Sequence, residues 1–195
     1  MIGIIDYGAG NLKSVQNALD YLGVGCGIVS TPEEIALCDR LILPGDGSFG
    51  FMMENLEKKR MVEPLKKYIS SGKPFLGICL GMQGLFESSE ESPGIRGLGI
   101  FKGDVVRLRT GKIPQIGWNT IAPEKKNDTL FKEGAMYFVN SYVVVPMDAS
   151  IIAARTDYFG PFVSAVRFNN VTAVQFHPEK SGAAGLALLK RWLSC

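Results

Sequence analysis

The sequence predicts an α/β fold, with a mostly parallel central sheet flanked by helices and antiparallel strand additions in its second half. The first half alternates short apolar runs with segments of helical periodicity, which is typical of βαβ units. In the second half, apolar runs follow one another without helices between them. The 195 residues are enough for one sizeable core and short for two, so we expect a single domain over residues 1–195.

The elements of the first half are expected in a regular order. Apolar runs predict strands at residues 2–5, 24–29, 40–43 and 73–78. A helix is expected after Asn11, because the apolar residues at 12, 15, 19 and 22 share one helical face. Further helices are expected around 51–56 and 62–69, and one starting over 82–87.

After about Gly94 the pattern changes to successive strands. Strand-like runs lie at residues 104–108, 137–145, 151–154, 162–168 and 171–176. A last helix is expected over 183–193, where Leu186, Leu189 and Leu193 lie on one face.

Composition excludes several classes of protein. The formal net charge of +2 gives no electrostatic case for nucleic acid or a membrane surface. No apolar run approaches the about 20 residues that span a bilayer, and no secretory leader is expected. Four unpaired cysteines, one histidine and no Cys-x-x-Cys disfavour a disulfide framework and a zinc site. We expect a cytoplasmic protein without metal or cofactor.

Cys79 is the candidate nucleophile. Residues 77–81 match a Gly-x-nucleophile-x-Gly turn between a strand and a helix, with cysteine in the serine position. The glycines remove Cβ atoms that would clash in so sharp a turn. The helix N-terminus then favours the thiolate, and the N–H of Leu80 is placed to stabilise an oxyanion. The turn alone leaves open a second reading, a buried and inert cysteine at the end of a strand.

His177 is the one imidazole available to serve this thiol as a base. It follows an apolar strand, and in extended chain Glu179 would point to the same side and fix its tautomer. Because the carboxyl ends of parallel strands meet at one sheet edge, Cys79 and His177 are expected to approach each other.

A glycine-rich turn at residues 45–50 formally matches Gly-x-Gly-x-x-Gly. A dinucleotide site is disfavoured, because the turn follows the third strand and no acidic residue ends another strand about 20 residues later. Backbone N–H groups that bind an oxyanion or substrate suit it better, and a plain turn remains an alternative.

With these residues in view, the chain resembles the triad, or class I, glutamine amidotransferases. Within them it is similar to the glutaminase subunits of imidazole glycerol phosphate synthase, in histidine biosynthesis. The resemblance spans the chain from Asp6 to the last helix. It rests on residues 77–83 and 177–181, and on the stretches 6–11, 44–49, 114–119 and 137–142.

The resemblance implies that Cys79 attacks the carboxamide of glutamine and that a glutamyl thioester and ammonia form. It implies roles for further residues, which are the oxyanion group Gly45, Asp46, Gly47 and Leu80, the substrate group Gln83, Ser141 and Tyr142, and the partner group Asn11, Trp118, Tyr137 and Lys180. The implied partner is a (β/α)₈-barrel cyclase subunit, bound as a heterodimer. It would use the ammonia to make imidazole glycerol phosphate and aminoimidazole carboxamide ribotide.

Three positions depart from this family. It often has valine where Asp46 stands, and histidine where Gln115 and Asn140 stand. A carboxylate directed into an oxyanion site would oppose the developing charge there, whereas one directed to solvent would not. The alternative functions are a glutaminase of another ammonia-channelling synthase, a non-catalytic partner-binding subunit, and a cysteine hydrolase that has no partner.

Overall fold

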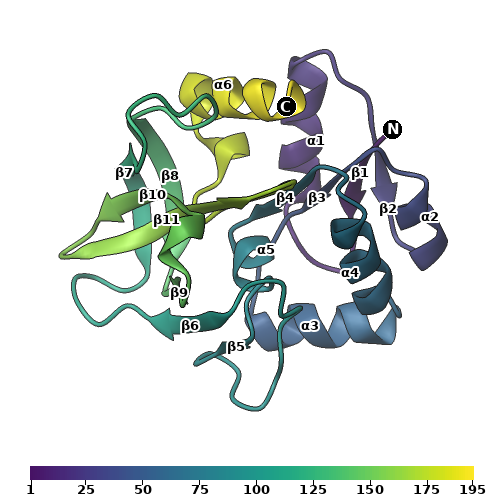
Figure 1. The fold of residues 1–195 in the computed structure, drawn as a ribbon, viewed down its shortest axis with the longest axis horizontal. Helices are drawn as coiled ribbons and strands as arrows, with labels where there is room; N and C mark the ends of the chain where they lie inside the picture. The colour runs from purple at the N-terminus through teal and green to yellow at the C-terminus, as the bar shows by residue number, and fades with distance from the viewer.

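The computed structural model describes residues 1–195, and strands and helices alternate through its first half (Figure 1). The helices are α1 (Leu12–Tyr21), α2 (Pro32–Ala36), α3 (Phe49–Lys58), α4 (Val62–Ser70), α5 (Leu80–Gln83) and α6 (Gly182–Leu193), with 3-10 turns η1 (Ala149–Ile151) and η2 (Pro178–Lys180). The strands are β1 (Ile2–Ile5), β2 (Cys26–Val29), β3 (Arg40–Leu43), β4 (Phe75–Ile78), β5 (Ser88–Ser89), β6 (Gly103–Arg107), β7 (Gln115–Pro123), β8 (Gly134–Asn140), β9 (Tyr142–Pro146), β10 (Ile152–Asp157), β11 (Pro161–Phe168) and β12 (Val171–Val174).

All twelve strands belong to one connected sheet, whose main path runs β2-β1-β3-β4-β12-β11-β10-β7-β8. The pairs from β2 to β12 are parallel, and those from β12 to β8 are antiparallel. Off this path, β9 pairs with β11 and β6, and β5 pairs with β6. This arrangement confirms the predicted fold class. None of the helices is long and apolar enough to cross a membrane.

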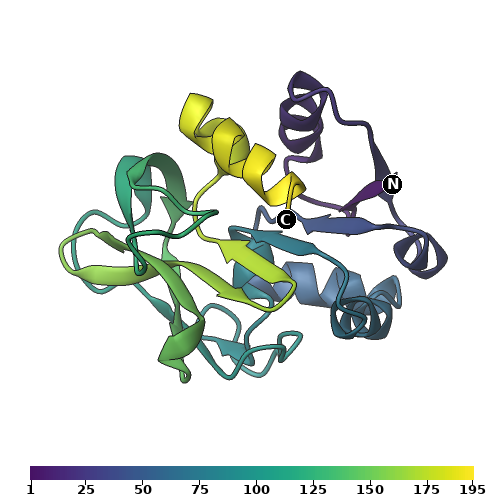
Figure 2. The same cartoon turned by 45° about the horizontal axis from the view of Figure 1, so that its top comes forward.

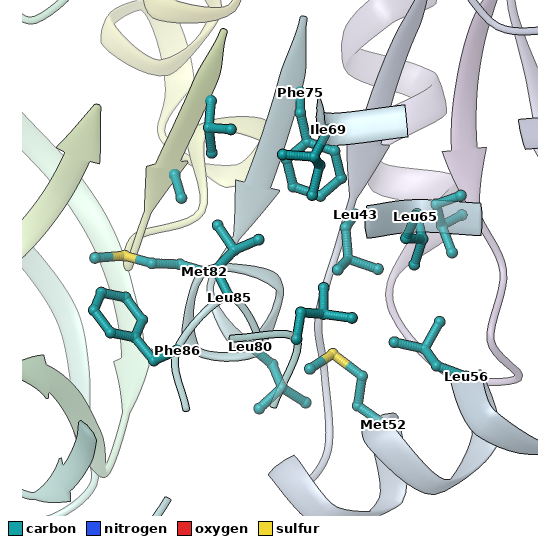
Figure 3. Close-up of a cluster of buried hydrophobic side chains, with 14 of the residues drawn as sticks. Leu43, Met52, Leu56, Leu65, Ile69, Phe75, Leu80, Met82, Leu85 and Phe86 are labelled. Carbon is teal, nitrogen blue, oxygen red and sulfur yellow. The ribbon is translucent and has the colours of Figure 1, made fainter. Parts of the chain in front are cut away.

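Helices cover both faces of the parallel part (Figures 1 and 2). One buried cluster joins the sheet to α1 and α6, and another joins it to α3, α4 and α5. Figure 3 shows the second cluster, where Leu56 of α3, Leu65 of α4 and Leu80 of α5 gather beside β3 and β4. β1 alternates between the clusters, since Ile4 belongs to the first and Ile5 to the second. Strands buried on both faces explain the unbroken apolar runs in the sequence.

Polar caps set where two helices begin. The Asn11 side chain accepts the N–H of Ser14 at 3.1 Å and caps α1, as its position before the apolar face predicts. α2 was not predicted, although its signal is local. Thr31 and Glu34 form a capping box, with Pro32 at the first helical position.

Two sequence predictions are corrected by the structure, and one strand was missed. The helix expected over 82–87 is wrong, because α5 ends at Gln83 and the carbonyls of Gly84, Leu85 and Phe86 accept N–H groups from residues 98–101 instead. The strand expected over 137–145 is divided at Ser141 into β8 and β9, which pair with different neighbours. β7 was not predicted, since its inward and outward positions do not alternate cleanly between apolar and polar residues.

The topology brings the ends of two parallel strands together. Ile78, the last residue of β4, lies opposite Val174, the last residue of β12. Cys79 follows the first and His177 stands three residues beyond the second, at the same sheet edge. The fold therefore delivers both candidate residues to one place.

Phe138 joins β8 to the rest of the core and allows a test of this packing. Its ring makes edge contacts with Phe162 at 5.8 Å and with Phe176 at 5.7 Å between centroids. We expect Phe138→Ala to lower the free energy of unfolding by about 3–5 kcal/mol in denaturant titrations. The exposed Phe168 is the control, and Phe168→Ala should cost less than about 1 kcal/mol. Equal losses would contradict the packing described.

Candidate active site

Cys79 lies in a backbone conformation that L-residues rarely adopt, with φ 55° and ψ −109°. Both sides of the residue are clamped. Its N–H donates to the carbonyl of Val174 at 2.7 Å, and its carbonyl accepts the N–H of Met82 at 3.0 Å. Such a conformation costs about 1–3 kcal/mol and persists only where surrounding contacts enforce it. Here β12 and α5 enforce it, and the side chain is turned away from the strand direction.

Two glycines make the turn possible. A Cβ on Gly81 would overlap the carbonyl oxygen of Leu43, and a Cβ on Gly45 would overlap Leu80 and the backbone of Gly81. The 45–47 loop therefore packs against the first turn of α5. As the first residue of that helix, Leu80 has no helical acceptor for its N–H. This N–H remains available for an oxyanion.

His177 and Glu179 form a buried pair. His177 Nδ1 donates to Glu179 Oε1 at 2.8 Å, and the two side chains are 7% and 2% exposed. The sequence reasoning expected extended chain here, and that detail is wrong. Pro178 begins η2, and the turn rather than a strand brings Glu179 back to the imidazole. With Nδ1 held by Glu179, Nε2 is left to face the cysteine.

The electrostatic surroundings keep this imidazole charged. Burial by itself favours the neutral ring and lowers the pKa of His177. Hydrogen bonding and charge interaction with Cys79 and Glu179 outweigh burial and raise the pKa to about 10. At neutral pH the site therefore holds an imidazolium, whose positive charge favours the thiolate form of the neighbouring cysteine. This is the arrangement that activates a cysteine nucleophile and supplies a proton to a leaving group.

A cavity of about 310 Å³ opens onto Cys79 and His177. Its walls include all the residues predicted for the oxyanion and substrate groups, namely Gly45, Asp46, Gly47, Leu80, Gln83, Ser141 and Tyr142. Lys180, expected at a partner, also lines it, whereas Glu179 lies behind His177. The volume and polar lining suit a small polar substrate.

A family model described as "Glutamine amidotransferase class-I" matches residues 3–193. The chain belongs to this family. The match confirms the sequence-based expectations of a glutamine amidotransferase and of an enzyme. It disfavours the alternatives of a non-catalytic subunit and an unrelated cysteine hydrolase.

Relatives named "Imidazole glycerol phosphate synthase subunit HisH" cover nearly the whole chain. The protein from Aquifex aeolicus is 50% identical, over 97% of this chain and 94% of the relative. The protein from Pyrococcus furiosus is 50% identical, over 98% and 97%. An Arabidopsis thaliana relative, "Imidazole glycerol phosphate synthase hisHF, chloroplastic", is 45% identical over 99% of this chain, which spans 34% of that relative.

Solved structures agree with the fold. "Crystal structure of glutamine amidotransferase" and "Structure of PurLQS from Thermotoga maritima" each have a TM-score of 0.81 and cover 99% of this chain and 97% of the other. At 21% and 18% identity, they support the class I amidotransferase architecture alone.

The Asp46 carboxylate turns back onto its own loop. Its Oδ1 accepts the N–H of Gly47 at 3.0 Å, so that N–H is not presented to the cavity. The buried Tyr7 hydroxyl holds the loop from below. It accepts the N–H of Asp46 at 3.1 Å and donates to the Asp46 carbonyl at 3.2 Å. Of the expected oxyanion donors, Leu80 is free and Gly47 is occupied.

The outer edge of β8 supports both catalytic candidates. The carbonyl of Tyr137 accepts the N–H of His177 at 2.9 Å, and the carbonyl of Val139 accepts the Cys79 thiol at 3.7 Å. The Val139 side chain meanwhile shares an exposed apolar face with two β7 residues, Ile116 at 64% and Trp118 at 59% exposure. Trp118 also packs edge-on against Tyr137, at 5.8 Å between ring centroids. We call Ile116, Trp118, Tyr137 and Val139 the outer apolar face.

Sequence reasoning missed several residues of the site. Glu91, Pro114, Val139 and Asn140 also line the cavity, and Ile116 belongs to the outer apolar face. Glu91 Oε2 accepts the N–H of Phe49, 42 positions away, so no local pattern announces it. The register of β7 with β8 places Asn140 opposite Gln115, but it could not indicate Asn140 beforehand because β7 was not predicted.

The single histidine allows its titration to be followed directly by NMR. We expect Glu179→Gln to lower the pKa of His177 well below about 10, because the carboxylate helps to hold the charged ring. Glu63→Gln, on the exposed surface of α4, should leave it unchanged. Because the folded-state pKa is raised from 6.5, this interaction stabilises the fold fully below pH 6.5 and is lost as the pH rises through about 10. An unchanged titration in Glu179→Gln would exclude the pairing.

Asp46 offers a test of the oxyanion loop. Asp46→Ala removes both a negative charge and the acceptor that occupies the Gly47 N–H. We expect kcat/KM for glutamine to rise about five- to tenfold. Asp46→Asn, which keeps an acceptor without the charge, should give a smaller rise. Asp20→Ala, at an exposed position of α1, should have no effect. A fall in Asp46→Ala would mean that the loop needs this carboxylate.

Proposed function

We propose that this chain is the glutaminase subunit of an imidazole glycerol phosphate synthase. In this role it hydrolyses L-glutamine to glutamate and ammonia and supplies the ammonia to a (β/α)₈-barrel cyclase subunit, with which it forms a heterodimer in the cytoplasm. The observation that carries the proposal is the buried Cys79, His177 and Glu179 constellation at a cavity of about 310 Å³. Family membership and the HisH relatives direct it to glutamine and to this synthase.

The proposed chemistry uses Cys79 as the nucleophile and His177 as the group that donates and accepts protons. The Cys79 thiolate attacks the carboxamide carbon of glutamine, and the carbonyl oxygen becomes an oxyanion beside the Leu80 N–H. The C–N bond breaks, and the nitrogen leaves as ammonia with a proton from the His177 imidazolium. The neutral His177 then takes a proton from water as water attacks the thioester. Glutamate is released, and the thiolate and imidazolium are restored. Glu179 holds the ring throughout.

Recognition of glutamine is assigned to the cavity walls. Gln83, Ser141 and Tyr142 are positioned to hold the substrate, as the family resemblance implies. Glu91 suits the α-ammonium group, since Oε2 is bonded to the Phe49 N–H while Oε1 is left free. A partly buried carboxylate that faces an ammonium group makes a strong, charge-assisted hydrogen bond.

The partner is assigned to the outer apolar face. Exposed Ile116 and Trp118 form a compact apolar surface beside the cavity, and such surfaces commonly mark protein interfaces. The Arabidopsis relative provides separate support, because about two-thirds of that protein lies outside the region matched by this chain. Lys180 lines the cavity from η2 and suits the mouth of an ammonia path to the partner. Asn11 has a structural task as the cap of α1, and its partner contact stays a prediction.

Glutamine hydrolysis tests this function. Ammonia release is measured for the chain alone, and then with a barrel cyclase subunit and its ribonucleotide substrate. We expect the complete mixture to release ammonia faster by about tenfold or more, and Cys79→Ala to abolish release because no other thiol lines the cavity. Cys26→Ala, outside the cavity, is the matched control.

Two outcomes would overturn the proposal at different levels. Undiminished ammonia release by Cys79→Ala would remove the glutaminase mechanism. Glutaminase activity that never responds to the barrel subunit would leave a glutaminase of another ammonia-channelling synthase.

A further inference from the structure

Gln175 touches the nucleophile, although neither the triad nor the cavity lining includes it. It directly follows β12, and its side chain is 0% exposed. Its Nε2 lies 3.5 Å from Cys79 Sγ, and its Oε1 lies 3.0 Å from Gln83 Nε2. A buried amide with both ends engaged is held in one orientation.

A backbone carbonyl determines which end of the Gln175 amide faces the sulfur. The carbonyl of Tyr142 only accepts, so Gln83 must direct its NH₂ group toward it, at 3.1 Å. The second N–H of Gln83 then reaches Gln175, which must present its oxygen. The NH₂ group of Gln175 consequently faces the sulfur. The chain of bonds from Tyr142 through Gln83 to Gln175 thus fixes a donor at Cys79.

The neighbours of the Cys79 sulfur differ in whether they favour the thiol or the thiolate. The Val139 carbonyl, at 3.7 Å, can bond only the protonated thiol. The Gln175 amide bonds the sulfur lone pairs and does so more strongly when the sulfur is negative. The His177 imidazolium adds a positive charge. Gln175 therefore favours the thiolate, whereas Val139 favours the thiol.

We propose that Gln175 is a further catalytic residue, whose buried amide donates a hydrogen bond to the Cys79 thiolate and holds it in position for attack. This inference deepens the proposed glutaminase function and rests on it. Gln175 transfers no proton. As the S–C bond forms and the sulfur loses its charge, the hydrogen bond weakens, and it recovers when the thioester is hydrolysed. Because Gln83 and Tyr142 also face the substrate, glutamine binding and thiolate alignment share one set of hydrogen bonds.

The test replaces the donor without changing the volume. Gln175→Met is nearly isosteric and cannot donate. Gln115→Met is the matched control, since Gln115 is also a buried glutamine, 2% exposed, and its amide has no hydrogen-bond partner. The folded protein is treated with iodoacetamide at pH 7, and alkylation of Cys79 is followed by mass spectrometry of the peptide that contains it. We expect Gln175→Met to slow it about tenfold, whereas Gln115→Met should not slow it.

Further measurements separate this role from packing. In Gln175→Met, kcat for glutamine should fall about tenfold while KM changes less than about threefold, because the lost hydrogen bond is made to the nucleophile and not to the substrate. Gln175→Glu, which keeps the shape but presents an acceptor, should slow alkylation further. If Gln175→Met does not fold, the alkylation rate of Gln175→Glu decides the test.

Alkylation at the wild-type rate in the Gln175 variants, or an equal slowing in Gln115→Met, would overturn the inference. Alkylation needs no glutamine, so the two proposals can fail separately. A chain that hydrolyses no glutamine, yet needs Gln175 for rapid alkylation, would refute the glutaminase function and leave the Gln175 contact standing.

Discussion

The parallel pairing of β4 with β12 is the contact on which the site depends. It places Val174 where its carbonyl can bind the N–H of Cys79, and that bond holds Cys79 at a positive φ. The strain at this residue is balanced by a strand on one side and the first turn of α5 on the other. Without the pairing, the sulfur would follow the strand direction, and the imidazole after β12 would lie elsewhere.

The polar groups around Cys79 are arranged by elements far apart in the chain. His177 is fixed by Glu179 through a 3-10 turn, and by the β8 backbone through Tyr137. The amide of Gln175 is oriented through Gln83 by a carbonyl at the start of β9. The groups that can only accept are the Glu179 carboxylate at His177 and the Tyr142 carbonyl at Gln83. The donor and acceptor directions of the site therefore follow largely from the backbone.

The predictable parts of this protein were those with local signals. Glycines around Cys79 indicated the turn, and unbroken apolar runs indicated the buried parallel strands. Proximity of His177 to Glu179 was also foreseen, although Pro178 makes the contact through a turn instead of a strand.

Features decided by distant contacts escaped prediction. α5 stops at Gln83 because residues 98–101 occupy the next carbonyls, and β8 separates from β9 because the two strands pair with different neighbours. Glu91 reaches the cavity through a bond to Phe49, and Gln175 reaches the sulfur through a fold-dependent strand pairing. Neither has a sequence pattern that distinguishes it from an ordinary polar residue.

The position of β8 at the edge of the sheet links a protein bound on the outer apolar face to the catalytic residues. The side chains of Tyr137 and Val139 belong to the outer apolar face, while their carbonyls bond to His177 and Cys79. The same two residues therefore join the exposed surface to the reacting sulfur. A protein bound to those side chains would contact the same two residues whose carbonyls hold the imidazole and the thiol, so binding there would restrict the position of both.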